Sequence, residues 1–503
     1  MTLPARIFDL HTHLFNARYI PLASIIANAM GKDESNLANH VARLLEELTE
    51  SSYPEPEPPE SHDEESLDEY RLERIWNVTR HELLGTTGSL DAMDKGLNNL
   101  MSRPLSAPAF HLLHSSGLMK AIKSLSEVDY VAEGWTDTLA TAHASVIPYG
   151  SLDASLTFEG FLDWAKGVVK KALRVVTTLM DPEAWGEAEN YLEFFQTMLK
   201  SEKQMAEKIF TGYGDGLPPL QISHYMMDMQ LAYAAKTPPR YPFHPVQVDR
   251  MHTLRRAYPA RIFGFSAFDP RRDDWRARAE DSLDKGFVGF KFYPAMGYKP
   301  AGNDSTTQAR IDDFFDFCVA KDAAVFAHCT PQGFQTRRKE GANAHPKHWR
   351  AVLENPRWSD LRLCLGHAGG GRMKNGDVAS AGWMAESEAE WNDADNFARV
   401  VTELCVRYPN VYCEIGYITE LFEDDKLEVF VANMERARKA TKGQPHDLLD
   451  KMAYGSDWHM PSMADKTREY LNVFLGIMNR EVYSNHLDQF FWKNACRFLK
   501  LPF

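Results

Sequence analysis

Two histidines near the start of the chain, His11 and His13, have the spacing of a metal-ligand pair. They end an apolar run that reads IFDLHTH over residues 7–13. Side chains two residues apart on a β-strand point to the same face, so both imidazoles could bind one metal ion. The pair therefore predicts a strand that delivers two nitrogen ligands to a metal site.

Other chemically capable residues end short segments that are rich in β-branched or aromatic side chains. Successive ends lie roughly 40 residues apart, the length of one strand, one loop and one returning helix. These end residues are Lys291, His328, His367, Glu414 and Asp457. Because parallel strands bring their carboxyl ends to one edge, the pattern predicts that these side chains share a site.

These segments, with two further ones at 221–229 and 261–268, give eight expected strands. We therefore expect an α/β fold, a (β/α)8 TIM-type barrel formed by residues 1–20 and 220–503. Residues 21–219 are expected to be a large, mostly helical insertion between strands one and two. Because the chain leaves the barrel at the catalytic end of strand one, the insertion is expected to act as a lid.

Within the insertion, helical patterns are expected over 37–48, over 161–180, and from Asp181-Pro182 towards Phe210. Residues 54–65 are rich in proline and acidic side chains, which is typical of a mobile surface loop.

The types and the order of the candidate site residues resemble the pattern of the amidohydrolase superfamily. These residues are His11, His13, Lys291, His328, His367 and Asp457. Three further segments resemble the amidohydrolase-related branch, which also contains non-oxidative decarboxylases: FDPR at 268–271, GFKFYP at 289–294 and NACRFL at 494–499. The resemblance covers residues 1–20 and 220–503 and leaves out the stretch between them.

A divalent metal ion, zinc or manganese, would be held by His11, His13, His328 and Asp457. Such an ion lowers the pKa of a bound water from about 15.7 to near 7, so hydroxide exists at neutral pH. Asp457 would be both a ligand and the general base.

Two residues leave the number of metal ions open. His367 could bind a second ion, or it could remain free to polarise a carbonyl group or transfer a proton. The resemblance implies that Lys291 bridges two ions if it is carboxylated; unmodified, its ammonium would meet an anionic group or a carboxylate such as Glu414. We favour one ion with His367 as a catalytic residue.

Substrate contacts are expected from side chains that follow strand ends, namely Tyr293, Tyr298, Glu414, Trp458 and His459. Arg271 and Arg272 could bind a substrate carboxylate, but arginines next to Asp273 and Asp274 are also typical of an ion-pair network.

The composition is that of a large globular enzyme. The 503 residues are 44% hydrophobic and 25% charged, enough for a sizeable core. The net charge of −14 argues against a nucleic-acid partner. Six scattered cysteines predict reduced thiols, and the absence of a signal peptide or a long apolar segment favours the cytoplasm and no membrane partner. A homo-oligomer is compatible with these features.

We therefore expect a metal-dependent hydrolase that cleaves a C–N or C–O bond in a small amide, lactone or ester. The alternative within enzymes is non-oxidative decarboxylation of an aromatic or enoic acid, which the same residues could perform. A third interpretation, an inactive barrel that serves as a protein-binding scaffold, would predict missing metal ligands.

Overall fold

The computed structural model describes residues 2–29, 39, 42–43, 45–46, 49, 51–53, 194, 197–233, 238–335, 340–375, 378–460 and 463–502. The helix predicted over 161–180 and the loop predicted over 54–65 lie outside these residues, as do most residues of the predicted insertion and the helix start at 181–182.

The chain divides into two compact units. The first consists of Met1–Leu14, Ala206–Ala232 and Phe243–Phe503, and the second of Phe15–Met205 and Tyr233–Pro242. In the second unit, helix α1 spans Leu22–Ala29, and Tyr19 Oη donates to Glu202 Oε1 at 2.7 Å.

Eight parallel strands form the sheet of the first unit, and their order in the sheet follows their order in the chain. The strands are β1 (Ile7–Thr12), β2 (Leu220–Tyr225), β3 (Ile262–Ala267), β4 (Gly289–Phe292), β5 (Ala324–Ala327), β6 (Leu363–Leu365), β9 (Val411–Glu414) and β10 (Met452–Ala453). A separate antiparallel hairpin consists of β7 (Met373–Asn375) and β8 (Val378–Ser380).

The sheet closes on itself between its first and last strands. Leu10 N donates to Tyr454 O at 3.0 Å, Asp457 N donates to His11 O at 2.8 Å, and Thr12 forms a parallel bridge with Trp458. The expected (β/α)8 TIM-type barrel is thereby confirmed, with the site residues at the carboxyl ends of its strands.

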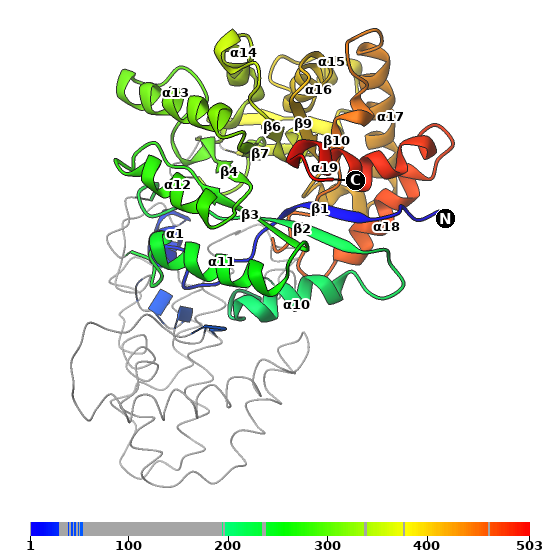
Figure 1. Ribbon diagram of the computed structural model, residues 1–503. Helices are drawn as coiled ribbons and strands as arrows, with labels where there is room; N and C mark the ends of the chain where they lie inside the picture. The colour runs from blue at the N-terminus through cyan, green and yellow to red at the C-terminus, as the bar shows by residue number, and fades with distance from the viewer. Residues whose placement is uncertain are drawn as a thin grey trace, which may run out of the picture. The chain divides into compact units, whose positions relative to one another are not determined.

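Helices surround the barrel strands (Figure 1). They are α10 (Glu202–Gly212), α11 (Val248–Ala257), α12 (Trp275–Asp284), α13 (Ser305–Ala320), α14 (Arg350–Leu353), α15 (Glu388–Trp391), α16 (Phe397–Arg407), α17 (Asp424–Ala440), α18 (Thr467–Met478) and α19 (Asn494–Leu499). Asp304 shows why one of them starts where it does, since its carboxylate caps the first turn of α13 by accepting from the Thr306 and Thr307 amides.

The core of the barrel is aromatic. Phe8, Tyr225, Phe265 and Phe326 are each 0% exposed and belong to one buried cluster. The C-terminal helix α19 adds Phe498, whose ring stacks on Phe265 with a centroid separation of 6.2 Å. Arg362, the residue before β6, donates to the Phe498 carbonyl, and the Phe498 ring contacts Tyr412 near the start of β9, so α19 lies at the end of the barrel opposite the site residues.

All six cysteines are buried and none forms a disulfide. Within the described ranges, no helix combines the length and the apolar character that crossing a bilayer requires.

Candidate metal centre

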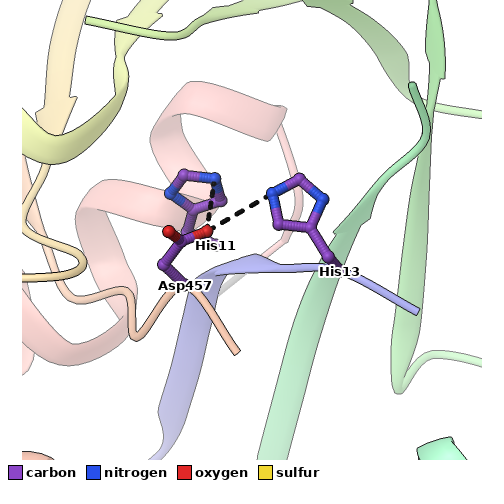
Figure 2. A group of neighbouring side chains, drawn as sticks. All are labelled: His11, His13 and Asp457. Carbon is purple, nitrogen blue, oxygen red and sulfur yellow. Dashed lines mark ion pairs between the residues drawn. The ribbon is translucent and has the colours of Figure 1, made fainter. Parts of the chain in front are cut away.

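Three ligand atoms from the two ends of the barrel sheet meet in its interior. His11 Nε2 and His13 Nε2 each lie 3.3 Å from Asp457 Oδ1 (Figure 2). The ligand atoms of the three residues all lie within 4.8 Å of one another, and all three residues are buried. The histidines come from the end of β1 and the aspartate from the segment after β10, so barrel closure brings them together.

The partners of the imidazoles fix which nitrogens face the aspartate. His13 Nδ1 lies 2.9 Å from the Tyr225 carbonyl oxygen, which can only accept, so Nδ1 carries the proton. His11 Nδ1 lies 2.9 Å from Glu414 Oε2, which also accepts from the His367 amide at 3.1 Å. Burial, together with the nearby Lys291 and His367, holds the pKa of His11 well below its usual range.

Both Nε2 atoms therefore direct lone pairs towards Asp457 Oδ1, a buried oxygen that forms no hydrogen bond. Three electron-pair donors turned towards one another suit a cation between them, and two imidazoles with one carboxylate are a donor set that fits a divalent metal ion. These three residues thus fit the predicted metal.

The fourth predicted ligand, His328, does not belong to this group of three. Its Nε2 donates to the Gln332 carbonyl at 2.6 Å, and its Nδ1 lies 3.1 Å from His367 Nε2. His367 in turn donates from Nδ1 to the Gly416 carbonyl at 3.1 Å, so two further lone pairs face each other. Burial lowers the pKa of His367 to about 4.

Lys291, on β4, lies next to His11. Its Nζ is 3.2 Å from His11 Nε2 and lies over the rings of Phe326 and Tyr225, 4.6 Å and 5.0 Å from their centroids. Burial lowers the pKa of Lys291 to about 8. Among the described residues it forms no ion pair with a carboxylate, so the contact with Glu414 that the sequence allowed is not formed.

Both candidate catalytic residues have an unusual backbone conformation. His367 has φ of 61° and Asp457 has φ of 60°, values that are uncommon for residues other than glycine. Such conformations persist only where surrounding contacts enforce them, and they cluster at functional sites. Burial opposes ionisation of Asp457, but the neighbouring His13, His367 and Lys291 outweigh it and lower the pKa of this carboxyl group.

Asp9 is a site residue that sequence reasoning missed. Its carboxylate accepts from Tyr213 Oη at 2.6 Å and from Ser456 N and Oγ at 2.8 Å and 2.5 Å, next to Asp457. It also accepts from the His11 amide at 3.1 Å. Burial raises the pKa of Asp9 to about 6. A carboxylate in the middle of an apolar strand was the available signal.

The residues predicted to contact substrate occupy different environments. Tyr293 lies against His328, with ring centroids 4.2 Å apart. Tyr298 donates to the Phe268 carbonyl at 3.0 Å, Trp458 donates to the Ala464 carbonyl at 3.3 Å, and His459 donates to the His13 carbonyl at 2.9 Å. These three side chains are buried, and burial lowers the pKa of His459 to about 3. Their substrate contacts remain predictions.

Arg271 and Arg272 pair with aspartates, as the ion-pair interpretation predicts. Arg272 makes two hydrogen bonds to Asp228, each of 2.8 Å, and Arg271 makes two to Asp269, each of 2.8 Å. Both aspartates line a cavity beside Lys291 that has a volume of about 10 Å³, enough for about one water molecule. A larger cavity of about 720 Å³ lies beside the β7–β8 hairpin, and none of the predicted site residues lines it.

Comparison with known proteins gives one family and several distant structures. The family model described as amidohydrolase matches residues 225–501. A search of curated proteins found no match.

Three solved structures illustrate the structural similarity. A probable 2-pyrone-4,6-dicarboxylic acid hydrolase from Acinetobacter baumannii is 10% identical, with a TM-score of 0.38 over 59% of this chain and 88% of that chain. A manganese complex of 5-carboxyvanillate decarboxylase from Novosphingobium aromaticivorans is 13% identical, with a TM-score of 0.38 over 65% and 88%. An amidohydrolase from Burkholderia multivorans with bound zinc is 16% identical, with a TM-score of 0.35 over 50% and 80%.

Proposed function

The chain belongs to the amidohydrolase family, and we propose that it is a metal-dependent hydrolase that cleaves a C–N or C–O bond in a small amide, lactone or ester. The observation that carries the proposal is the meeting of His11 Nε2, His13 Nε2 and Asp457 Oδ1 in the buried barrel interior. An inactive scaffold would gain nothing from three buried lone pairs that point towards one another.

A divalent cation held by these three residues would supply an activated water and polarise the substrate carbonyl. Zinc suits two imidazoles and a carboxylate, and manganese is the alternative. Asp457 accepts the proton of the attacking water and passes it to the leaving group. His367, whose Nε2 is unprotonated, provides a second group that can take up and return a proton.

We favour one cation over two. The group of three donors does not include His328, whose Nδ1 faces His367 instead. A second cation would use His328 and His367 and would need Lys291 to be carboxylated. Metal analysis of the purified protein separates the two cases, since one equivalent per chain agrees with our proposal and two equivalents contradict it.

Lys291 favours a second candidate function, the non-oxidative decarboxylation of an aromatic or enoic acid. Its buried ammonium lies beside His11 and over two aromatic rings, without a carboxylate partner among the described residues. A buried cation of this kind would pair with the carboxylate or phenolate of a substrate. Asp457 or His367 would then protonate the carbon that loses carbon dioxide.

The decisive experiment compares metal-free protein with protein reloaded with zinc or manganese. Acid release from amides, lactones and esters is measured in parallel with carbon dioxide release from carboxylated phenols and enoic acids. Acid release that depends on the metal supports hydrolysis, whereas carbon dioxide release supports the second candidate. Protein that binds less than about a tenth of an equivalent and gains no activity from either metal would exclude both.

Asp457→Asn tests the base in the same assays. Losing a general base and a ligand charge should lower kcat by about 100-fold or more, while circular dichroism stays that of the wild type. Asp395→Asn is the matched control, because Asp395 is exposed and far along the chain from the three donors. A wild-type kcat in Asp457→Asn would refute the assignment.

A further inference from the structure

We propose that Glu414 is a positioning residue whose single oxygen Oε2 fixes both a metal ligand, His11, and a catalytic residue, His367. The inference rests on the proposed function, because it assigns Glu414 a role relative to a cation held by His11. It replaces direct contact with substrate, the role that the position of Glu414 at a strand end suggested.

The first part of the argument is the imidazole of His11. Glu414 is the last residue of β9 and is 0% exposed, and its Oε2 lies 2.9 Å from His11 Nδ1. Because Oε2 accepts this hydrogen bond, the proton of His11 stays on Nδ1 and Nε2 keeps its lone pair for a cation. A carboxylate in this position also makes the imidazole a stronger electron donor and fixes the orientation of its ring.

The second part is the backbone of His367. The same Oε2 accepts from the His367 amide at 3.1 Å, at the residue whose φ is 61°. The other anchor is the hydrogen bond from His367 Nδ1 to the Gly416 carbonyl, two residues after Glu414. The end of β9 therefore holds both the main chain and the ring of His367 in place. These contacts maintain a backbone conformation that would be unfavourable without them.

The third part is the space around the other carboxylate oxygen. Glu414 Oε1 is buried and forms no hydrogen bond. It lies against Gly416 and Gly455, where an added Cβ would come within 2.3 Å of Oε1 in each case. A buried acceptor without a donor lowers the stability of the fold. The contacts made by the other oxygen, Oε2, are therefore the reason for a carboxylate at this position. Two glycines leave the room that the carboxylate needs.

Glu414→Gln tests the proposal because it preserves the shape of the side chain and removes its charge. The matched control is Glu420→Gln. Glu420 also accepts a backbone amide on one oxygen, from Arg372 at 2.8 Å, and has a second buried oxygen without a partner, but it contacts neither histidine. Zn²⁺ affinity is measured by competition with a chromogenic chelator, and thermal unfolding establishes that each variant folds.

We expect Glu414→Gln to bind Zn²⁺ about 10–100-fold more weakly than the wild type, and Glu420→Gln to stay within about twofold. In zinc-saturated protein, Glu414→Gln should lower kcat for a substrate that the wild type hydrolyses and leave KM unchanged. If Glu414→Gln does not fold, Glu414→Asp, which keeps the charge in the same cavity, is measured in its place.

Three results would overturn the inference: wild-type Zn²⁺ affinity in Glu414→Gln, an equal loss of affinity in Glu420→Gln, or a raised KM with an unchanged kcat, which would indicate substrate contact. These results leave the proposed function intact as long as the wild type binds Zn²⁺. A wild-type protein that binds no Zn²⁺ refutes the proposed function itself, and the role of Glu414 with it.

Discussion

The ion pair between Asp228 and Arg272 gives a prediction that separates stability from substrate binding. Arg272 donates from Nε and Nη2 to the two oxygens of Asp228, each at 2.8 Å. The side chains are 3% exposed for Asp228 and 15% for Arg272, so Arg272→Met would leave a carboxylate buried without its partner. Breaking a buried pair in this way costs about 3–5 kcal/mol, and the partial exposure of Arg272 places our expectation at about 3 kcal/mol.

Thermal unfolding measures this cost. For a domain of 150–250 residues, about 1 kcal/mol lowers Tm by about 2–4 °C, so we expect Arg272→Met to lower the Tm of the barrel by about 5 °C or more. In the double variant Asp228→Leu/Arg272→Met no charge is left buried, so much of the stability should return. Arg310→Met is the control, because its partner Asp273 is 90% exposed and the pair should contribute less than about 1 kcal/mol.

The outcome decides between the two interpretations that the sequence left open for these arginines. A structural pair predicts the loss of stability with little change in KM. A wild-type Tm in Arg272→Met, combined with a raised KM for an acidic substrate, would refute our reasoning and show that Arg272 binds substrate.

Three further predictions concern the fold and the metal. Burial lowers the pKa of His345 to about 3, so below about pH 6.5 the unfolded chain binds a proton at this residue and the folded chain does not. The free energy of unfolding should therefore fall by about 2 kcal/mol by about pH 5. His345→Asn keeps an acceptor for the Lys347 amide and should remove this pH dependence in urea unfolding; an unchanged slope would contradict it. A Cβ at Gly289 would lie 2.1 Å from the Ala324 carbonyl oxygen, so Gly289→Ala should destabilise the barrel by about 3 kcal/mol or more. Gly476 has open space around it, so Gly476→Ala should be neutral or stabilising, and equal Tm values for the two variants would be inconsistent with this packing. Zn²⁺ added to chelator-treated protein at about 100 times its Kd should stabilise the fold by about 2.7 kcal/mol, and His13→Ala should lose that gain; an equal rise in Tm in both proteins would argue against His13 as a ligand.

Much of the barrel could be predicted from the chain itself. Strands of a parallel barrel are buried on both faces, so each appears in the sequence as a short continuous apolar run, and the helices between them set a regular spacing. The β7–β8 hairpin was not predicted, because Met373–Asn375 and Val378–Ser380 are short and carry no such run. Helical patterns over 161–180 lie outside the described residues and stay predictions.

The sequence also determined which side chains could do chemistry, because residue type alone shows that His11, His13 and Asp457 can donate to a metal. The partners of the site side chains depended on contacts between residues that lie from about 40 to more than 400 positions apart, which local patterns do not encode. Only the folded barrel placed Glu414 behind His11 and Asp9 beside Ser456, turned His328 towards His367, and paired Arg272 with Asp228. The physical reason is that proton positions and charge pairing follow from distances of about 3 Å in three dimensions, and a linear chain specifies those distances only once it has folded.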